Sequence, residues 1–256
     1  PGNYKLSSSP RGVYETCNNV LWTDLNHKLL QYFPTDEKYA AAMERSLINI
    51  LFAAQNDNGA IRYFNHMTGK KEAGTMFNTC CEVQACRQIG QLPQFIYSYN
   101  DNNVYVNLYA ASEYKFFAGG AKGTLIMDTA FPYSQDVKIT LSLQKEGEFT
   151  LNLRIPSWCA ADKVDILLNG ELAAKAAPGT YYALNRQFKD GDVITFSLPM
   201  EIKATKYVGI SQIEGKVRYG IQYGPLLMAL TGDADPSCIQ PGGEAVANLS
   251  LTPTDL

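Results

Sequence analysis

The chain has 256 residues, a formal net charge of -3 and 18% charged residues. This length suffices for one large hydrophobic core or for two smaller domains. The near balance of charges excludes the basic surface that is typical of nucleic-acid-binding proteins. No apolar run reaches the roughly 20 residues that a membrane-spanning helix needs. We therefore expect neither a nucleic-acid partner nor a membrane partner.

The first hundred residues predict mostly helix. Apolar residues recur at close to the helical period of 3.6 before and after Pro34, which separates two helical segments. The run from Asn56 to Gly59 predicts a turn, followed by a short extended stretch over 60–65. Thr79 or Asn78 is a suitable N-cap for a later helix. The predicted helices cover 14–33, 37–55 and 80–89, with a short one ending near residue 97.

The pattern changes near residues 99–103. Val104 to Tyr109 alternates apolar and polar residues, as a half-buried strand does. Many short segments of this kind, separated by Gly, Pro, Asn and Asp turns, predict a β-sandwich or barrel. We therefore divide the chain into a helical part, 1–100, and a β part, 101–256. The predicted strands cover 104–109, 113–117, 124–131, 136–144, 148–154, 163–169, 192–198, 201–208 and 217–223.

The vicinal pair Cys80-Cys81, together with Glu15 and Cys17, is the most informative motif. The six cysteines are not spaced like a small disulfide scaffold, and a chain of this size does not need one. Thiolates and carboxylates are zinc ligands, and the start of a helix favours a thiolate. The four residues predict either a structural zinc site or a zinc-activated sulfur nucleophile. Three buried thiols without a metal are the third alternative.

Several other side chains have simpler interpretations. The remaining cysteines are expected to be packing residues, and core burial is the first expectation for both tryptophans. Glu44 and Arg45 are expected to cap the helix or to pair on one helix face. For Glu82 two roles stay open, support of a metal ligand and a solvated carboxylate in the first helical turn. The packing cysteines are Cys86, Cys159 and Cys238, and the tryptophans are Trp22 and Trp158.

A set of ordered motifs between about residues 10 and 230 resembles the β-L-arabinofuranosidase family of glycoside hydrolases. This group was long catalogued as a domain of unknown function and has a zinc-bound cysteine nucleophile. The segments that carry the resemblance are Tyr14-Glu15-Thr16-Cys17-Asn18, Lys38-Tyr39-Ala40, Met43-Glu44-Arg45-Ser46-Leu47, Cys80-Cys81, Arg87, Leu92-Pro93, Tyr97, Val104 to Tyr109, Leu153 to Trp158, Asn169-Gly170-Glu171, Gly191 to Ile194, Arg218-Tyr219-Gly220 and Gly224-Pro225-Leu226.

The resemblance implies a fold and a site. Residues 1–100 would be the C-terminal part of an (α/α)6 catalytic barrel, and 101–256 would form the β-sandwich region. Glu15, Cys17, Cys80 and Cys81 would hold Zn2+, with Cys80 as the nucleophile. The family's acid/base glutamate would lie upstream of Pro1. One departure is the helix start, which contains Pro-Asn in the family and Glu82-Val83-Gln84 here.

Two functions follow as hypotheses. The first is a fragment of a retaining glycoside hydrolase that cleaves β-L-arabinofuranosides or related furanosides in plant glycans. It would need the missing N-terminal half of the same protein and would be inactive alone. The alternative is a non-catalytic carbohydrate-binding or structural β-sandwich module with a structural zinc site. The chain does not identify the compartment; a periplasmic or secreted location is favoured over a cytoplasmic one.

Overall fold

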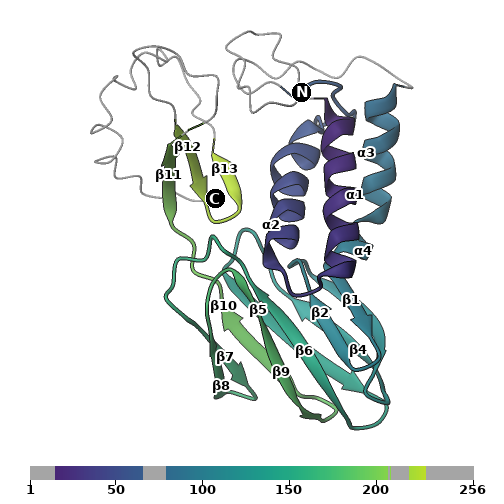
Figure 1. Ribbon diagram of the computed structural model, residues 1–256, viewed down its shortest axis with the longest axis vertical. Coiled ribbons are helices and arrows are strands. Elements are labelled where there is room, and N and C mark those ends of the chain that lie inside the picture. The colour runs from purple at the N-terminus through teal and green to yellow at the C-terminus, as the bar shows by residue number, and fades with distance from the viewer. Residues whose placement is uncertain (1–14, 66–78, 207, 209–218, 229–256) are drawn as a thin grey trace. The chain divides into compact units, whose positions relative to one another are not determined.

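The computed structural model describes residues 15–65, 79–206, 208 and 219–228 (Figure 1). These residues form two compact units, each assembled from separated segments of the chain. The first unit takes its described residues from 1–21, 46–86 and 201–256. The second takes them from 22–45 and 87–200. The predicted division at residue 100 stays a prediction.

The predicted helices are present where the structure describes them. The segment predicted as one helix over 37–55 changes its winding along its length, from α-helix to a π-helical and then a 3-10 turn. The predicted turn after it is confirmed, since Gly59 has a φ of 81° and its N–H donates to Asn56 O at 2.8 Å. Among the described residues, no helix is both long and apolar enough to cross a membrane. The helical elements are α1 (Thr16–Tyr32), α2 (Glu37–Ser46), η1 (Leu47–Leu51), η2 (Phe52–Ala54), α3 (Cys80–Gln91) and α4 (Pro93–Ile96).

Ten strands of the second unit form two sheets. The four-stranded sheet has the order β1-β2-β6-β9, in which only β2 and β6 run parallel. The six-stranded sheet has the order β3-β4-β5-β10-β7-β8 and is antiparallel throughout. The strands are β1 (Tyr97–Asn100), β2 (Asn103–Val106), β3 (Ser112–Ala118), β4 (Ala121–Asp128), β5 (Asp136–Leu143), β6 (Gly147–Ile155), β7 (Val164–Leu168), β8 (Glu171–Ala176), β9 (Thr180–Phe188) and β10 (Val193–Ser197).

Both sheets contribute to one hydrophobic core. In β5 the buried residues are every second one, Val137, Ile139, Leu141 and Leu143, so one face of the strand is buried. In β6 the residues from Leu151 to Ile155 are all buried. Such a run fits a strand that lies inside its sheet, with β2 on one side and β9 on the other.

Three strands of these sheets were not predicted, and each lies at a sheet edge. They are β1, β8 and β9. An edge strand has a neighbour on one side only and tolerates more polar residues. In β9 only Leu184 and Phe188 are buried, so the alternation that identified the inner strands is absent there.

A small three-stranded sheet belongs to the first unit. It consists of β11 (Ile202–Lys206), β12 (Tyr219–Tyr223) and β13 (Leu226–Met228), in that order. Asn49 of η1 ties it to the helical residues, since its amide donates to Pro225 O at 2.9 Å and accepts from Leu227 N at 2.7 Å. The last described residues are therefore anchored to the unit that contains the vicinal cysteines.

A buried guanidinium holds α2 to β6 within the second unit. Arg154 is fully buried and contacts both Glu37 and Glu44 of α2, with four nitrogen–oxygen distances between 2.9 and 3.1 Å. Arg154 also donates to Asn107 O, and Trp158 Nε1 donates to Glu44 at 2.7 Å. The predicted pairing of Glu44 on its own helix face is therefore wrong, because its carboxylate is turned inward to a cation from the sheet.

Candidate metal centre

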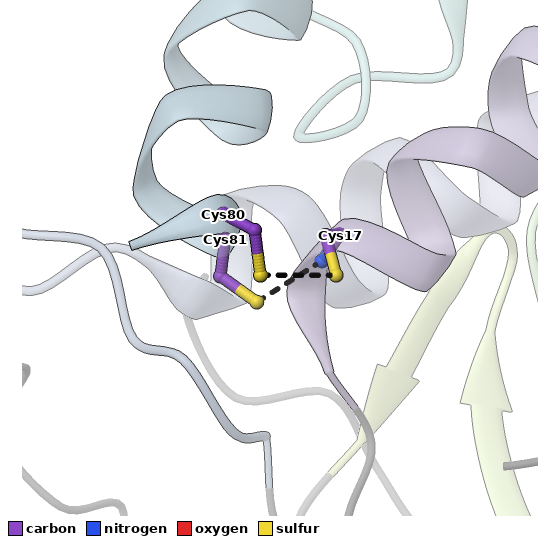
Figure 2. Close-up of side chains that lie close together, drawn as sticks. All are labelled: Cys17, Cys80 and Cys81. Atoms are coloured by element: carbon purple, nitrogen blue, oxygen red, sulfur yellow. Dashed lines mark hydrogen bonds between the residues drawn. The ribbon is translucent and has the colours of Figure 1, made fainter. Parts of the chain in front are cut away.

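Three thiols of the first unit converge from the first turns of two helices. Cys17 is the second residue of α1, and Cys80 and Cys81 are the first two residues of α3. Their sulfur atoms all lie within 4.8 Å of one another and point to a common centre (Figure 2). Cys80 Sγ lies 3.8 Å from Cys17 Sγ, and Cys17 N–H donates to Cys81 Sγ at 3.4 Å. The structure thus brings Cys17 of the Glu-x-Cys motif together with the Cys80-Cys81 pair.

Glu15 stands beside the thiol cluster. Its Oε2 accepts a hydrogen bond from Cys17 Sγ at 3.4 Å. For a tetrahedral zinc ion with Zn–S near 2.3 Å and Zn–O near 2.0 Å, two sulfurs are about 3.8 Å apart and an oxygen and a sulfur about 3.5 Å. The Cys17–Cys80 pair and the Glu15–Cys17 pair match these separations. The three cysteines could therefore hold a metal ion, and Glu15 lies beside one of them.

The extended segment predicted over 60–65 is hydrogen-bonded to the start of α1. Thr16 N–H donates to Tyr63 O at 3.0 Å, and the Thr16 hydroxyl donates to Arg62 O at 2.8 Å. A bridge between Glu15 and Phe64 continues this pairing. As a result, the Tyr63 hydroxyl lies 3.6 Å from Cys80 Sγ. Tyr63 was not predicted as a site residue. The only indication of it in the sequence was its place in the predicted extended segment.

Burial separates the three cysteines into two kinds. Cys17 and Cys81 are buried, and Cys80 is exposed. Desolvation raises the pKa of Cys17 to about 12 and, as its largest cause, also raises the pKa of Cys81. The hydrogen bond with Tyr63 lowers the pKa of Cys80. In the metal-free chain Cys80 is therefore the most accessible and the most acidic of the three thiols.

Tyr63→Phe is expected to make Cys80 less reactive. Without the hydroxyl the Cys80 thiolate loses a hydrogen-bond donor, so its pKa rises and less thiolate is present at pH 7.5. Alkylation of Cys80 in the metal-free chain, followed by mass spectrometry, should slow severalfold, and its pH profile should move to higher pH. Tyr133→Phe, a change at a well-exposed tyrosine, is the matched control. Equal rates in the two variants would contradict a role for the Tyr63 hydroxyl.

Other sequence expectations have mixed outcomes. Cys159 is buried in the core of the second unit, as predicted, and Cys238 lies outside the described residues. Cys86 is exposed, so the prediction that it packs internally is wrong. Trp22 is also exposed, against the prediction of core burial, whereas Trp158 is partly buried and packs against the core. Neither Cys86 nor Trp22 lies on a buried helix face.

The helices and the thiol cluster define a chain with a cysteine-rich site that could hold a metal ion. Residues 2–94 match the catalytic domain of the GH127 β-L-arabinofuranosidases, and residues 103–200 match the middle domain of that family. The chain belongs to the GH127 β-L-arabinofuranosidase family. This confirms the family resemblance seen in its motifs.

Solved structures give the same result. A GH127 β-L-arabinofuranosidase from Geobacillus stearothermophilus is 25% identical with a TM-score of 0.75, over 89% of this chain and 37% of the other. A second GH127 β-arabinofuranosidase is 26% identical with a TM-score of 0.78, over 89% and 38%. A comparison with curated proteins finds no match. The chain therefore spans less than two fifths of the length of these solved relatives.

Proposed function

We propose that the chain is part of a retaining glycoside hydrolase that cleaves β-L-arabinofuranosides or related furanosides, with Cys80 as the nucleophile. The observation that carries this proposal is the exposed Cys80 thiol within a cluster of two buried thiols and a carboxylate. Membership of the GH127 family supports the reaction class. The names of the solved relatives support the furanoside substrate.

We further propose how the chain fits into the whole protein. Residues 1–100 are the closing part of an (α/α)6 barrel, and 101–256 form the β-sandwich region. The share of each solved relative that the chain covers, 37% and 38%, supports a fragment. The catalytic-domain match to 2–94 supports the barrel assignment, and the single core shared by two sheets supports the sandwich. The rest of the protein is then the partner that completes the barrel.

Glu15, Cys17, Cys80 and Cys81 would hold a zinc ion. When bound, zinc keeps a coordinated thiol deprotonated at neutral pH and fixes the direction of its sulfur. The buried thiols Cys17 and Cys81 are suited to a permanent ligand role, because a sugar has no access to them. Cys80 is exposed and can meet a substrate.

The reaction at Cys80 follows the double displacement of retaining glycosidases. The Cys80 sulfur donates an electron pair to C1 of the furanose, and the bond from C1 to the leaving oxygen breaks. The leaving oxygen takes a proton from an acid outside these 256 residues. Water then attacks C1 and gives a proton to the conjugate base of that acid, while the C1–S bond breaks and the sulfur recovers its electron pair. Tyr63, 3.6 Å from Cys80 Sγ, is placed to donate a hydrogen bond to the sulfur when it carries negative charge.

The substrate and the setting follow from the same proposal. An oligosaccharide of a plant glycan is the expected substrate, and the chain alone is expected to be inactive because the proposed proton donor belongs to the rest of the protein. A periplasmic or secreted location fits a protein that degrades polymeric glycans.

Removal of the metal gives the first test. The chain is expected to bind one zinc ion, measured by elemental analysis after dialysis, and a Cys17→Ser, Cys81→Ser double variant is expected to retain none. In the full-length protein, chelation should abolish release of arabinose from a β-L-arabinofuranoside, and added zinc should restore it.

Cys159→Ala, a change at a buried cysteine of the other unit, is the matched control and should keep its zinc. Full zinc content in the double variant would contradict the proposed ligands. Unchanged activity in the chelated full-length protein would contradict the metal-dependent mechanism. Zinc binding without any glycosidase activity of the full-length protein would favour the structural-site alternative.

A further inference from the structure

The first turn of α3 is closed by hydrogen bonds between Thr79 and Glu82. Thr79 directly precedes the helix, and Glu82 is its third residue. Glu82 Oε2 accepts a hydrogen bond from Thr79 N–H at 3.1 Å and another from the Thr79 hydroxyl. Val83 N–H donates to Thr79 O at 3.3 Å and starts the helical ladder. The bond from Thr79 N–H to Glu82 is one half of a capping box, the half in which a Glu at the third position returns to the N-cap.

The Glu82 carboxylate is not a solvated surface group. Its Oε1 atom is buried and has no hydrogen-bond partner among the residues that the structure describes. Burial of an unpartnered carboxylate oxygen costs free energy. The bonds to Thr79 are therefore the interactions that hold this side chain. Of the two roles left open by the sequence, the structure favours support of the neighbouring residues.

The residues inside this cap are the vicinal cysteines. A helix start leaves its first backbone N–H groups without intrahelical partners, and an uncapped first turn frays. The positions of both sulfurs depend on the backbone angles of Cys80 and Cys81. Two contacts depend on those angles, Cys80 Sγ to Cys17 Sγ at 3.8 Å and Cys17 N–H to Cys81 Sγ at 3.4 Å.

We propose that Thr79 and Glu82 are positioning residues for the thiol cluster, and that the hydrogen bonds between them direct Cys80 and Cys81 towards Cys17. The importance of this for catalysis rests on the proposed function, whereas the positioning itself can be measured in the metal-free chain. Neither residue needs to touch metal or substrate.

The test compares Glu82→Ala with Glu82→Gln and measures alkylation of Cys81 in the metal-free chain. Cys81 is buried, so it reacts only when the first turn opens. Loss of the cap should speed alkylation of Cys81 by about 5-fold to about 30-fold. These factors correspond to the typical and the largest cost of losing an N-cap. Glu82→Gln should react close to the wild-type rate, since glutamine also closes a capping box. Thr79→Ala should behave like Glu82→Ala.

A second readout follows the metal site directly. Titration with Co2+, detected by its thiolate absorption band, should show a fall in affinity by a similar factor in Glu82→Ala and not in Glu82→Gln. Cys86→Gly is the matched control, because it weakens the middle of the same helix at an exposed position and leaves the cap intact.

Three outcomes would overturn the proposal. The first is an unchanged alkylation rate in Glu82→Ala. The second is equal acceleration in Glu82→Gln, which would assign the effect to the carboxylate charge. The third is equal acceleration in Cys86→Gly, which would assign it to general helix stability. If the wild-type chain bound no Co2+ but the alkylation rates followed the expected order, the positioning role would stand and the metal site would fail.

Discussion

Cys80→Ala in the full-length protein is expected to lower kcat by at least about 10,000-fold, the scale seen when an enzyme loses its nucleophile. Alanine has no electron pair to donate to C1, so the covalent intermediate cannot form. The other two thiols are buried and cannot replace it. The measurement is release of arabinose from an activated β-L-arabinofuranoside, together with mass spectrometry of the trapped wild-type intermediate, which should carry the sugar on Cys80.

The matched control is Cys86→Ala, the same change at the other exposed cysteine of α3, and it should keep full activity. Zinc content is measured in both variants to separate loss of the nucleophile from loss of the metal. An inactive Cys80→Ala protein that still holds zinc would support the mechanism. Ordinary activity of Cys80→Ala, or a sugar adduct on another residue, would contradict it.

The thiol cluster could be predicted from sequence because each half of it is a local signal. A vicinal cysteine pair after a capping residue and a Glu-x-Cys motif at another helix start are both readable without a fold. The family resemblance then joined the two halves across 63 residues. Tyr63 could not be found in this way. Its place at Cys80 depends on the pairing of 61–65 with the start of α1, which is a tertiary contact.

Dependence on a tertiary contact also explains why the partner of Glu44 was predicted wrongly. On sequence, Arg45 is the nearest cation, and a helix-surface pair is the ordinary expectation for such neighbours. The actual partner, Arg154, lies 110 residues away on a strand. The sequence held one indication, because Glu37 and Glu44 are two helical turns apart and share the face that carries the buried Ala40 and Ala41. Carboxylates on an apolar face require a buried partner.

Arg154→Met is accordingly expected to destabilise the second unit by about 3–5 kcal/mol, the usual loss when one member of a buried ion pair is removed. The side chains have similar length, so the loss is mainly electrostatic: Glu37 and Glu44 would stay buried without their cation. Urea unfolding can follow Trp158, which donates to Glu44, in a Trp22→Phe background that removes the other tryptophan. Arg87→Met, which breaks the partly exposed pair with Asp24, is the matched control and should cost no more than about 1 kcal/mol.

The loss should also depend on pH. Burial raises the pKa of Glu37 even in the wild-type protein, where Arg154 opposes the shift. Without Arg154 the pKa of Glu37 rises further. A carboxyl whose pKa is higher in the folded than in the unfolded state stabilises the fold at low pH, and this stabilisation is lost as the pH rises. Arg154→Met should therefore be closer to wild type at pH 5 than at pH 8. A loss that is equal at both pH values would mean that the two carboxylates leave the interior in the variant. The network would then depend on packing of the arginine stem more than on its charge.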